Sequence, residues 1–182
     1  KDGKEDVYSI MGSWMFDSTF HIDNIRADGV NETLIHEFNH SFCNPMVEKY
    51  WKDLEKNSGN IFKLVEKEMR NQAYGDSKTM MKETLVRTAT IKYLTDNEKK
   101  DAKWHIRYEE KNSFFCVNDM YKALDNYSQE RSKYPNFESY MPQLCKEFNN
   151  IKPKTIKKLI KNFYSDFKIE TSFTTPSLLI NN

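Results

Sequence analysis

The sequence has 182 residues, a formal net charge of +1 and 30% charged residues. This length is sufficient for one domain with a hydrophobic core. The balanced charge argues against nucleic acid as a partner, because nucleic-acid binding requires a basic stripe, and a solvated helix face explains the lysine-rich stretch at 152–161. No apolar run approaches the roughly 20 residues of a membrane span. The odd number of cysteines, three, argues against a disulfide framework.

The N-terminal part contains two runs with a β-strand pattern. Residues 7–11 form a short apolar run that ends at Gly12, and apolar residues alternate between 16 and 25. We therefore predict a small N-terminal β-sheet ahead of the first helix.

The segment at 34–42, LIHEFNHSF, carries His36 and His40 four positions apart, so both imidazoles project from one face of a helix and can reach one metal ion. Glu37 follows the first histidine, where it can take a proton from a metal-bound water. This HExxH spacing is the signature of zincin metallopeptidases. Zincins keep a small sheet before this helix, whose edge strand holds the substrate.

The flanking residues favour a helix for this motif. Asn31 is suited to be its N-cap, and Asn44-Pro45 is expected to end it, because proline disfavours helical geometry in the residue before it. The side away from the histidines is expected to pack on the core through Leu34, Phe38 and Phe42.

The rest of the chain has apolar residues at helical spacing. Helices are predicted near 45–56, 60–72, 77–94, 98–111, 115–132, 136–149 and 154–167. Asn57-Ser58-Gly59 is expected to separate the first two, Ser77 to cap the third, and 169–180 to be extended. We predict an α+β, predominantly α-helical, zincin-like fold, with one domain over 1–150, truncated at its N-terminus. Residues 151–182 would add a C-terminal helix and an extended tail to it.

A catalytic zinc ion needs a third protein ligand besides the two histidines. The metzincin pattern requires glycine at 43 and histidine at 46, where this chain has Cys43 and Met46. A glutamate from a later helix is the other common solution, and Glu83 is the leading candidate because Arg87, one turn on, could orient it or bind substrate. The alternatives that stay open are Glu66, Glu68, His105 and Cys43.

Three segments carry a resemblance to a family: HEFNHSFCNP at 36–45, ETLVRTATIKYL at 83–94 and YSQERSKYPNFESYMP at 127–142. They resemble a bacterial domain family of unknown function that is regarded as gluzincin-type metallopeptidases. The resemblance covers residues 7 to 150 and departs from the family pattern at Cys43 and Tyr140. It implies that His36, His40 and Glu83 bind zinc and that Glu37 is the catalytic acid and base.

The expected function is therefore zinc-dependent hydrolysis of peptide bonds, with Glu37 as general base toward a zinc-activated water. Candidates for stabilising the oxyanion are Arg87, Tyr108 and His105. The alternative is a catalytically degenerate module that binds a protein or a glycan through an aromatic-rich surface. We expect a monomer that acts on peptides or proteins, and, since the resembling family is generally exported, an extracytoplasmic or secreted protein whose leader has been removed.

Overall fold

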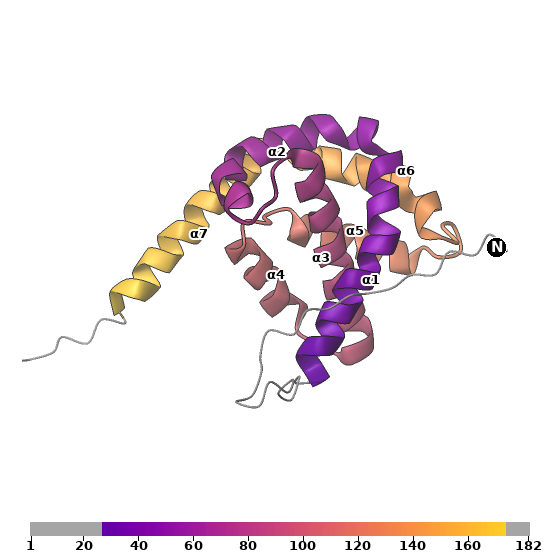
Figure 1. Ribbon diagram of the computed structural model, residues 1–182, viewed down its shortest axis with the longest axis horizontal. Coiled ribbons are helices and arrows are strands. Elements are labelled where there is room, and N and C mark those ends of the chain that lie inside the picture. The colour runs from indigo at the N-terminus through magenta and orange to yellow at the C-terminus, as the bar shows by residue number, and fades with distance from the viewer. Residues whose placement is uncertain (1–26, 174–182) are drawn as a thin grey trace, which may run out of the picture.

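A computed structural model describes residues 27–173, with side chains from 31 to 165, and this part of the chain forms seven helices and no strand. The predicted α+β class is therefore wrong, and the helical content alone is confirmed. The runs at 7–11 and 16–25 lie outside the described residues. The helices are α1 (Ala27–Lys49), α2 (Trp51–Asn71), α3 (Ser77–Glu98), α4 (Ala102–Lys111), α5 (Val117–Gln129), α6 (Phe137–Asn150) and α7 (Pro153–Phe173) (Figure 1).

The first helix is longer than predicted at both ends. It begins at Ala27 rather than after Asn31, whose side chain instead donates a hydrogen bond to Glu98 at the end of α3. It also continues through Pro45 to Lys49. A proline inside a helix costs about 3 kcal/mol, and the buried side chains of Cys43 and Val47 on either side of it offset this cost.

The orientation of α1 is opposite to the predicted one. Phe38 and Phe42, expected in the core, are 41% and 65% exposed. The histidine side packs against α3 instead, where the Asn39 amide donates to the Thr90 hydroxyl over 3.1 Å. The sequence predicted that the apolar side of α1 packs on the core. In the structure, the polar side with the histidines is the one that contacts the rest of the described chain.

The second helix runs through Asn57-Ser58-Gly59, where a break was predicted. Asn57 and Ser58 are buried, yet both are satisfied by distant carbonyls. The Asn57 amide donates to the carbonyls of Phe148 (2.8 Å) and Ile151 (3.0 Å), which joins α2 to the end of α6. Because these two polar side chains have partners elsewhere in the fold, they do not compete with the helix backbone.

The third helix is the central element, and it packs against α1, α2, α4 and α5 (Figure 1). Its N-cap is Asp76, not Ser77, since the Asp76 carboxylate accepts hydrogen bonds from the backbone N–H groups of Lys78 and Thr79 at 2.8 Å. Most residues of α3 between Met80 and Thr90 are buried, and Glu83 is one of them.

The helices α4 to α7 lie where apolar periodicity predicted them. The exception is the end of α7, which is helical up to Phe173, so the extended segment predicted from 169 is wrong over 169–173. Its remainder lies outside the described residues. Ile156 and Phe163 of α7 belong to the same apolar core as α2 and α6. Over 27–173, no helix has both the length and the apolar character that crossing a bilayer demands, in agreement with the sequence.

Candidate metal centre

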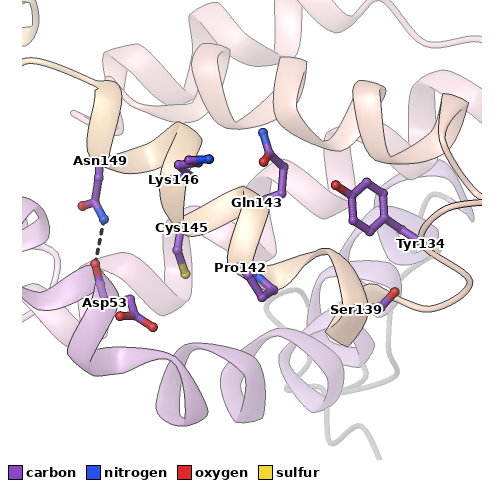
Figure 2. Close-up of a pocket in the computed structure, with 8 residues that line it drawn as sticks. All are labelled: Asp53, Tyr134, Ser139, Pro142, Gln143, Cys145, Lys146 and Asn149. Atoms are coloured by element: carbon purple, nitrogen blue, oxygen red, sulfur yellow. Dashed lines mark hydrogen bonds between the residues drawn. The ribbon is translucent and has the colours of Figure 1, made fainter.

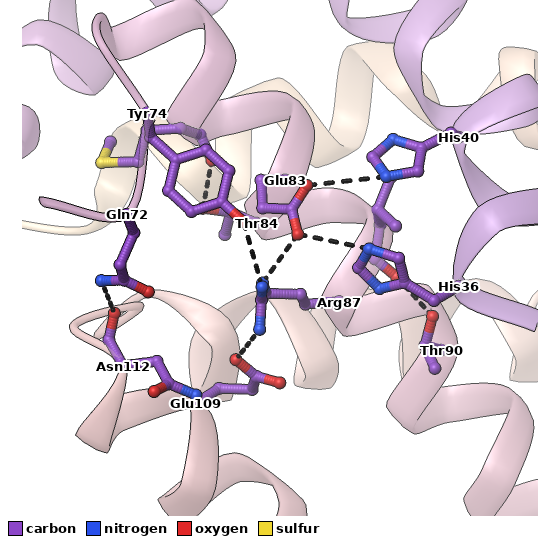
Figure 3. Close-up of polar contacts among 12 residues, drawn as sticks. His36, His40, Gln72, Tyr74, Glu83, Thr84, Arg87, Thr90, Glu109 and Asn112 are labelled. Atoms are coloured by element: carbon purple, nitrogen blue, oxygen red, sulfur yellow. Dashed lines mark hydrogen bonds and ion pairs between the residues drawn. The ribbon is translucent and has the colours of Figure 1, made fainter. Parts of the chain in front are cut away.

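His36, His40 and Glu83 meet where α1 packs against α3 (Figure 3). His36 Nε2 lies 3.3 Å from Glu83 Oε1, and His40 Nε2 lies 3.6 Å from Glu83 Oε2. The two imidazole rings are 5.0 Å apart and nearly perpendicular. One nitrogen or oxygen atom from each of the three residues lies within 4.8 Å of the others. Two imidazoles and a carboxylate form a donor set that suits a divalent cation such as zinc.

The orientation of the histidines is supported by asparagines of α1. His40 Nδ1 lies 3.4 Å from the Asn44 side-chain oxygen, and this contact holds the ring with Nε2 facing Glu83. The hydrogen bond from Asn39 to Thr90 fixes the rotation of α1 relative to α3. The first contact orients the His40 ring, and the second holds the side of α1 that carries His36 and His40 against α3.

Glu83 is 6% exposed and reaches the histidines from a buried position. Burial alone raises the pKa of its carboxyl, but the hydrogen bond with His36 and the charges of Arg87, His36 and His40 outweigh burial and hold the pKa below its usual range. Glu83 is therefore an anion, the form in which a carboxylate binds a cation.

Arg87 lies behind Glu83 and is engaged on all three nitrogens. Its Nε donates to Glu83 Oε1 (2.9 Å), one terminal nitrogen to Glu109 Oε2 (2.6 Å) and the other to the Tyr74 hydroxyl (3.1 Å) (Figure 3). Burial lowers the pKa of Arg87, while Glu109 and Glu83 raise it above its usual value, so the guanidinium is charged. The geometry directs Arg87 to Glu83 rather than to solvent.

The other predicted oxyanion candidates do not join this cluster. His105 is buried, with Nδ1 3.7 Å from Glu32 Oε1, and Tyr108 is 50% exposed and stacks on Trp104. Glu37 is exposed and makes no hydrogen bond or ion pair with any described residue. By helical geometry it lies on the strip of α1 next to His36.

The alternatives to Glu83 as third ligand are also placed elsewhere. Glu66 pairs with Arg70 on α2, and Glu68 is on the same helix. Burial raises the pKa of Cys43 to about 12, so it is a thiol rather than the thiolate that binds metal. Between residues 31 and 165, one group of three histidine, cysteine or acidic side chains lies close enough to share a metal ion, and it consists of His36, His40 and Glu83.

Sequence reasoning missed Tyr74 and Glu109. Tyr74 lies in the loop before α3, and Glu109 lies on α4, 22 residues after Arg87. Neither belongs to a local pattern with the HExxH helix, so only the fold brings them together. Asn44 could have been found, because it lies one turn after His40 on the same helix.

A pocket of about 480 Å³ lies between α2 and α6 (Figure 2). Asp53, Cys145 and Lys146 are among its lining residues, and the Asn149 amide donates to the Asp53 carbonyl at one end. It shares no residue with the cluster of His36, His40 and Glu83 and contains no histidine. The pocket is therefore not part of the candidate metal site, whatever its size.

A family model described as "Domain of unknown function (DUF4932)" matches residues 2–147. The matched range contains both histidines, Glu37 and Glu83. Comparisons with curated proteins and with solved structures give no match.

Proposed function

Because the chain belongs to this family of unknown function, whose description states no reaction, we propose a function from the site itself: a zinc-dependent peptidase whose ion is held by His36, His40 and Glu83. The observation that carries the proposal is the approach of their three ligand atoms to within 4.8 Å. The imidazoles come from consecutive turns of α1 and the carboxylate from α3, so the site depends on the packing of two helices.

The fit of the residues to a divalent cation supports the proposal. Glu83 is buried and anionic, and its oxygens point at two separate imidazoles. The side chains of His36 and His40 are 22% and 28% exposed, so the open side of the cluster is accessible to a substrate. A structural zinc site normally has four protein ligands and no open position, whereas this cluster offers three.

When bound, zinc would act as a Lewis acid on a substrate carbonyl and lower the pKa of water toward about 7. Glu37 would accept a proton from the attacking water and pass it to the leaving amine. Its exposure leaves the carboxylate available for both transfers. Because Arg87 is held by Glu83, Glu109 and Tyr74, it supports the ligand and does not contact the substrate.

The test compares the wild type with Glu37→Gln on a peptide library, with the zinc content of both measured by elemental analysis. Hydrolysis should fall by roughly 10² to 10⁴, the usual contribution of a general base, while zinc content stays equal. Glu48→Gln is a matched control, since Glu48 is an exposed glutamate of α1 that pairs with Lys78 and Lys82.

Two results would overturn the proposal. A wild type that holds one zinc ion and cleaves no peptide in a broad library is not a peptidase. Equal rates in the wild type and Glu37→Gln would remove Glu37 from the reaction.

A second candidate function, glycan binding, has its own supporting observation. Trp104 and Tyr108 of α4 are 61% and 50% exposed and stack at 5.7 Å with an angle of 11° between their rings. An exposed stacked pair of this kind offers a flat apolar surface to a sugar ring. Glycan-array binding that is lost in Trp104→Ala and independent of zinc would favour this function over hydrolysis.

We further propose that the protein acts outside the cytoplasm as a monomer. All three cysteines are free and buried, and burial raises the pKa of Cys43 and Cys116 to about 12, which leaves these thiols unreactive toward oxidants. Detection of the protein in the cytoplasmic fraction alone, or a dimer in light scattering, would contradict this proposal.

A further inference from the structure

Glu109 contacts Arg87, which in turn contacts the candidate metal ligand Glu83, and no sequence pattern indicated this connection. It belongs to α4, and its side chain is only 12% exposed. Among residues 31–165 it forms one ion pair, with Arg87 at 2.6 Å. Arg87 in turn holds Glu83 and lies with its guanidinium 4.5 Å from the centre of the Phe114 ring. The three charged side chains therefore form a largely buried chain, Glu83–Arg87–Glu109 (Figure 3).

An arginine next to a metal-binding carboxylate has two opposite effects. Its hydrogen bond orients the carboxylate, and orienting contacts of this kind strengthen a metal site. Its positive charge, however, repels a divalent cation, and burial makes this repulsion stronger than it would be in water. A second anion on the far side of the arginine would cancel the charge and keep the hydrogen bond.

We propose that Glu109 is a charge-compensating positioning residue: it neutralises Arg87, so that the guanidinium can orient Glu83 without repelling the ion bound by His36, His40 and Glu83. The inference rests on the proposed zinc site. Tyr74 completes the arrangement as a neutral acceptor for the remaining nitrogen of Arg87. Glu109 therefore acts on the ion through Arg87 and does not contact it.

A purely structural role for the pair gives different expectations. If Arg87 and Glu109 only link α3 to α4, their loss lowers the free energy of unfolding and leaves the affinity for zinc unchanged. If Glu109 compensates the charge of Arg87, its loss lowers the affinity for zinc, and the simultaneous loss of Arg87 restores part of that affinity.

The experiment measures the zinc dissociation constant of the full chain by competition with a chromophoric chelator. Glu109→Gln should weaken zinc binding by about 10- to 100-fold, the range for residues that support metal ligands. Arg87→Met/Glu109→Gln should bind zinc more tightly than Glu109→Gln alone. Glu110→Gln is the matched control, because Glu110 is the next residue of α4, is 15% exposed and pairs with Arg107 instead; its zinc affinity should stay within about twofold of the wild type.

Arg87→Met compared with Arg87→Met/Glu109→Gln tests the same inference without a guanidinium that has lost its Glu109 partner, in case Glu109→Gln fails to fold. Loss of Glu109 in this background should change the affinity by less than about threefold. A larger loss there, or a double variant no better than Glu109→Gln, would overturn the inference while the zinc site stands. Absence of zinc binding by the wild type would overturn the proposed function together with it.

Discussion

Asn57 is predicted to be one of the most sensitive polar positions of the fold. Its amide donates to two carbonyls, those of Phe148 at 2.8 Å and Ile151 at 3.0 Å, at the junction of α6 and α7. The Phe148 carbonyl also accepts from the backbone N–H of Ile151, so it keeps one partner when Asn57 is lost. An unsatisfied buried group costs about 1–3 kcal/mol, so Asn57→Ala should lower the free energy of unfolding by about 2–3 kcal/mol.

Asn57→Asp should be more damaging at neutral pH. An ionised carboxylate cannot donate to either carbonyl, and an uncompensated buried charge costs about 3–5 kcal/mol. Burial raises the pKa of such a carboxyl above about 3.9, the ordinary value for aspartate. The protonated form is therefore favoured in the folded state, and the stability of the variant is highest below the unfolded pKa and falls as the pH rises through the folded pKa.

The assay is urea unfolding of the wild type, Asn57→Ala and Asn57→Asp at pH 4 and pH 7.5. Asn60→Asp is the matched control, because Asn60 lies on the same helix and is exposed; its effect should stay within about 0.5 kcal/mol. The assigned role of the Asn57 amide is wrong if the free energy of unfolding of Asn57→Asp is within about 0.5 kcal/mol of the wild-type value at pH 7.5. It is also wrong if the variant loses more stability, relative to the wild type, at pH 4 than at pH 7.5.

Three further predictions concern the metal, a helix cap and a buried phenol. Zinc at about 1,000 times its dissociation constant should stabilise the fold by about 4 kcal/mol and raise the melting temperature by about 8–16 °C. Calorimetry of the His40→Ala variant should show no such rise. Asp76→Ala should cost about 1 kcal/mol at pH 7. The hydrogen bond from the backbone N–H of Thr79 lowers the pKa of Asp76. Denaturation curves should therefore show the wild type to be more stable than Asp76→Ala above about pH 3.9, and this stability difference should disappear as the pH falls through the lowered pKa. Tyr140→Phe removes a hydrogen bond of 2.8 Å to the Ala123 carbonyl, and chemical denaturation should report a loss of about 1 kcal/mol.

The sequence predicted the pair of histidines from their spacing and Glu83 as the leading candidate for the third ligand, but it did not predict the side chains behind Glu83. His36 and His40 are one turn apart on any helix, so their common face follows from spacing alone. The approach of Glu83 required α1 and α3 to pack together, and the sequence left four alternatives to it. No sequence pattern pointed to Glu109, because its ion pair with Arg87 forms only once α4 has packed against α3.

The errors in the helix boundaries have a related cause. Asn57-Ser58-Gly59 is typical of a helix end, yet the partners of Asn57 and Ser58 are backbone carbonyls from other helices, which no local pattern reveals. Phe38 and Phe42 were assigned to the core on the assumption that an apolar face is buried. The assumption failed because α1 turns its histidines toward the buried Glu83.

Over the described residues, α1 is held mainly along one side, where it meets α3, and its opposite side with Phe38 and Phe42 is exposed. A helix held on one side opens at a lower free energy than one that is enclosed. An ion bound by His36, His40 and Glu83 would cross-link α1 to α3, in addition to the contacts that already join the two helices. Amide hydrogen exchange would then slow in α1 when zinc is added and change little in α6.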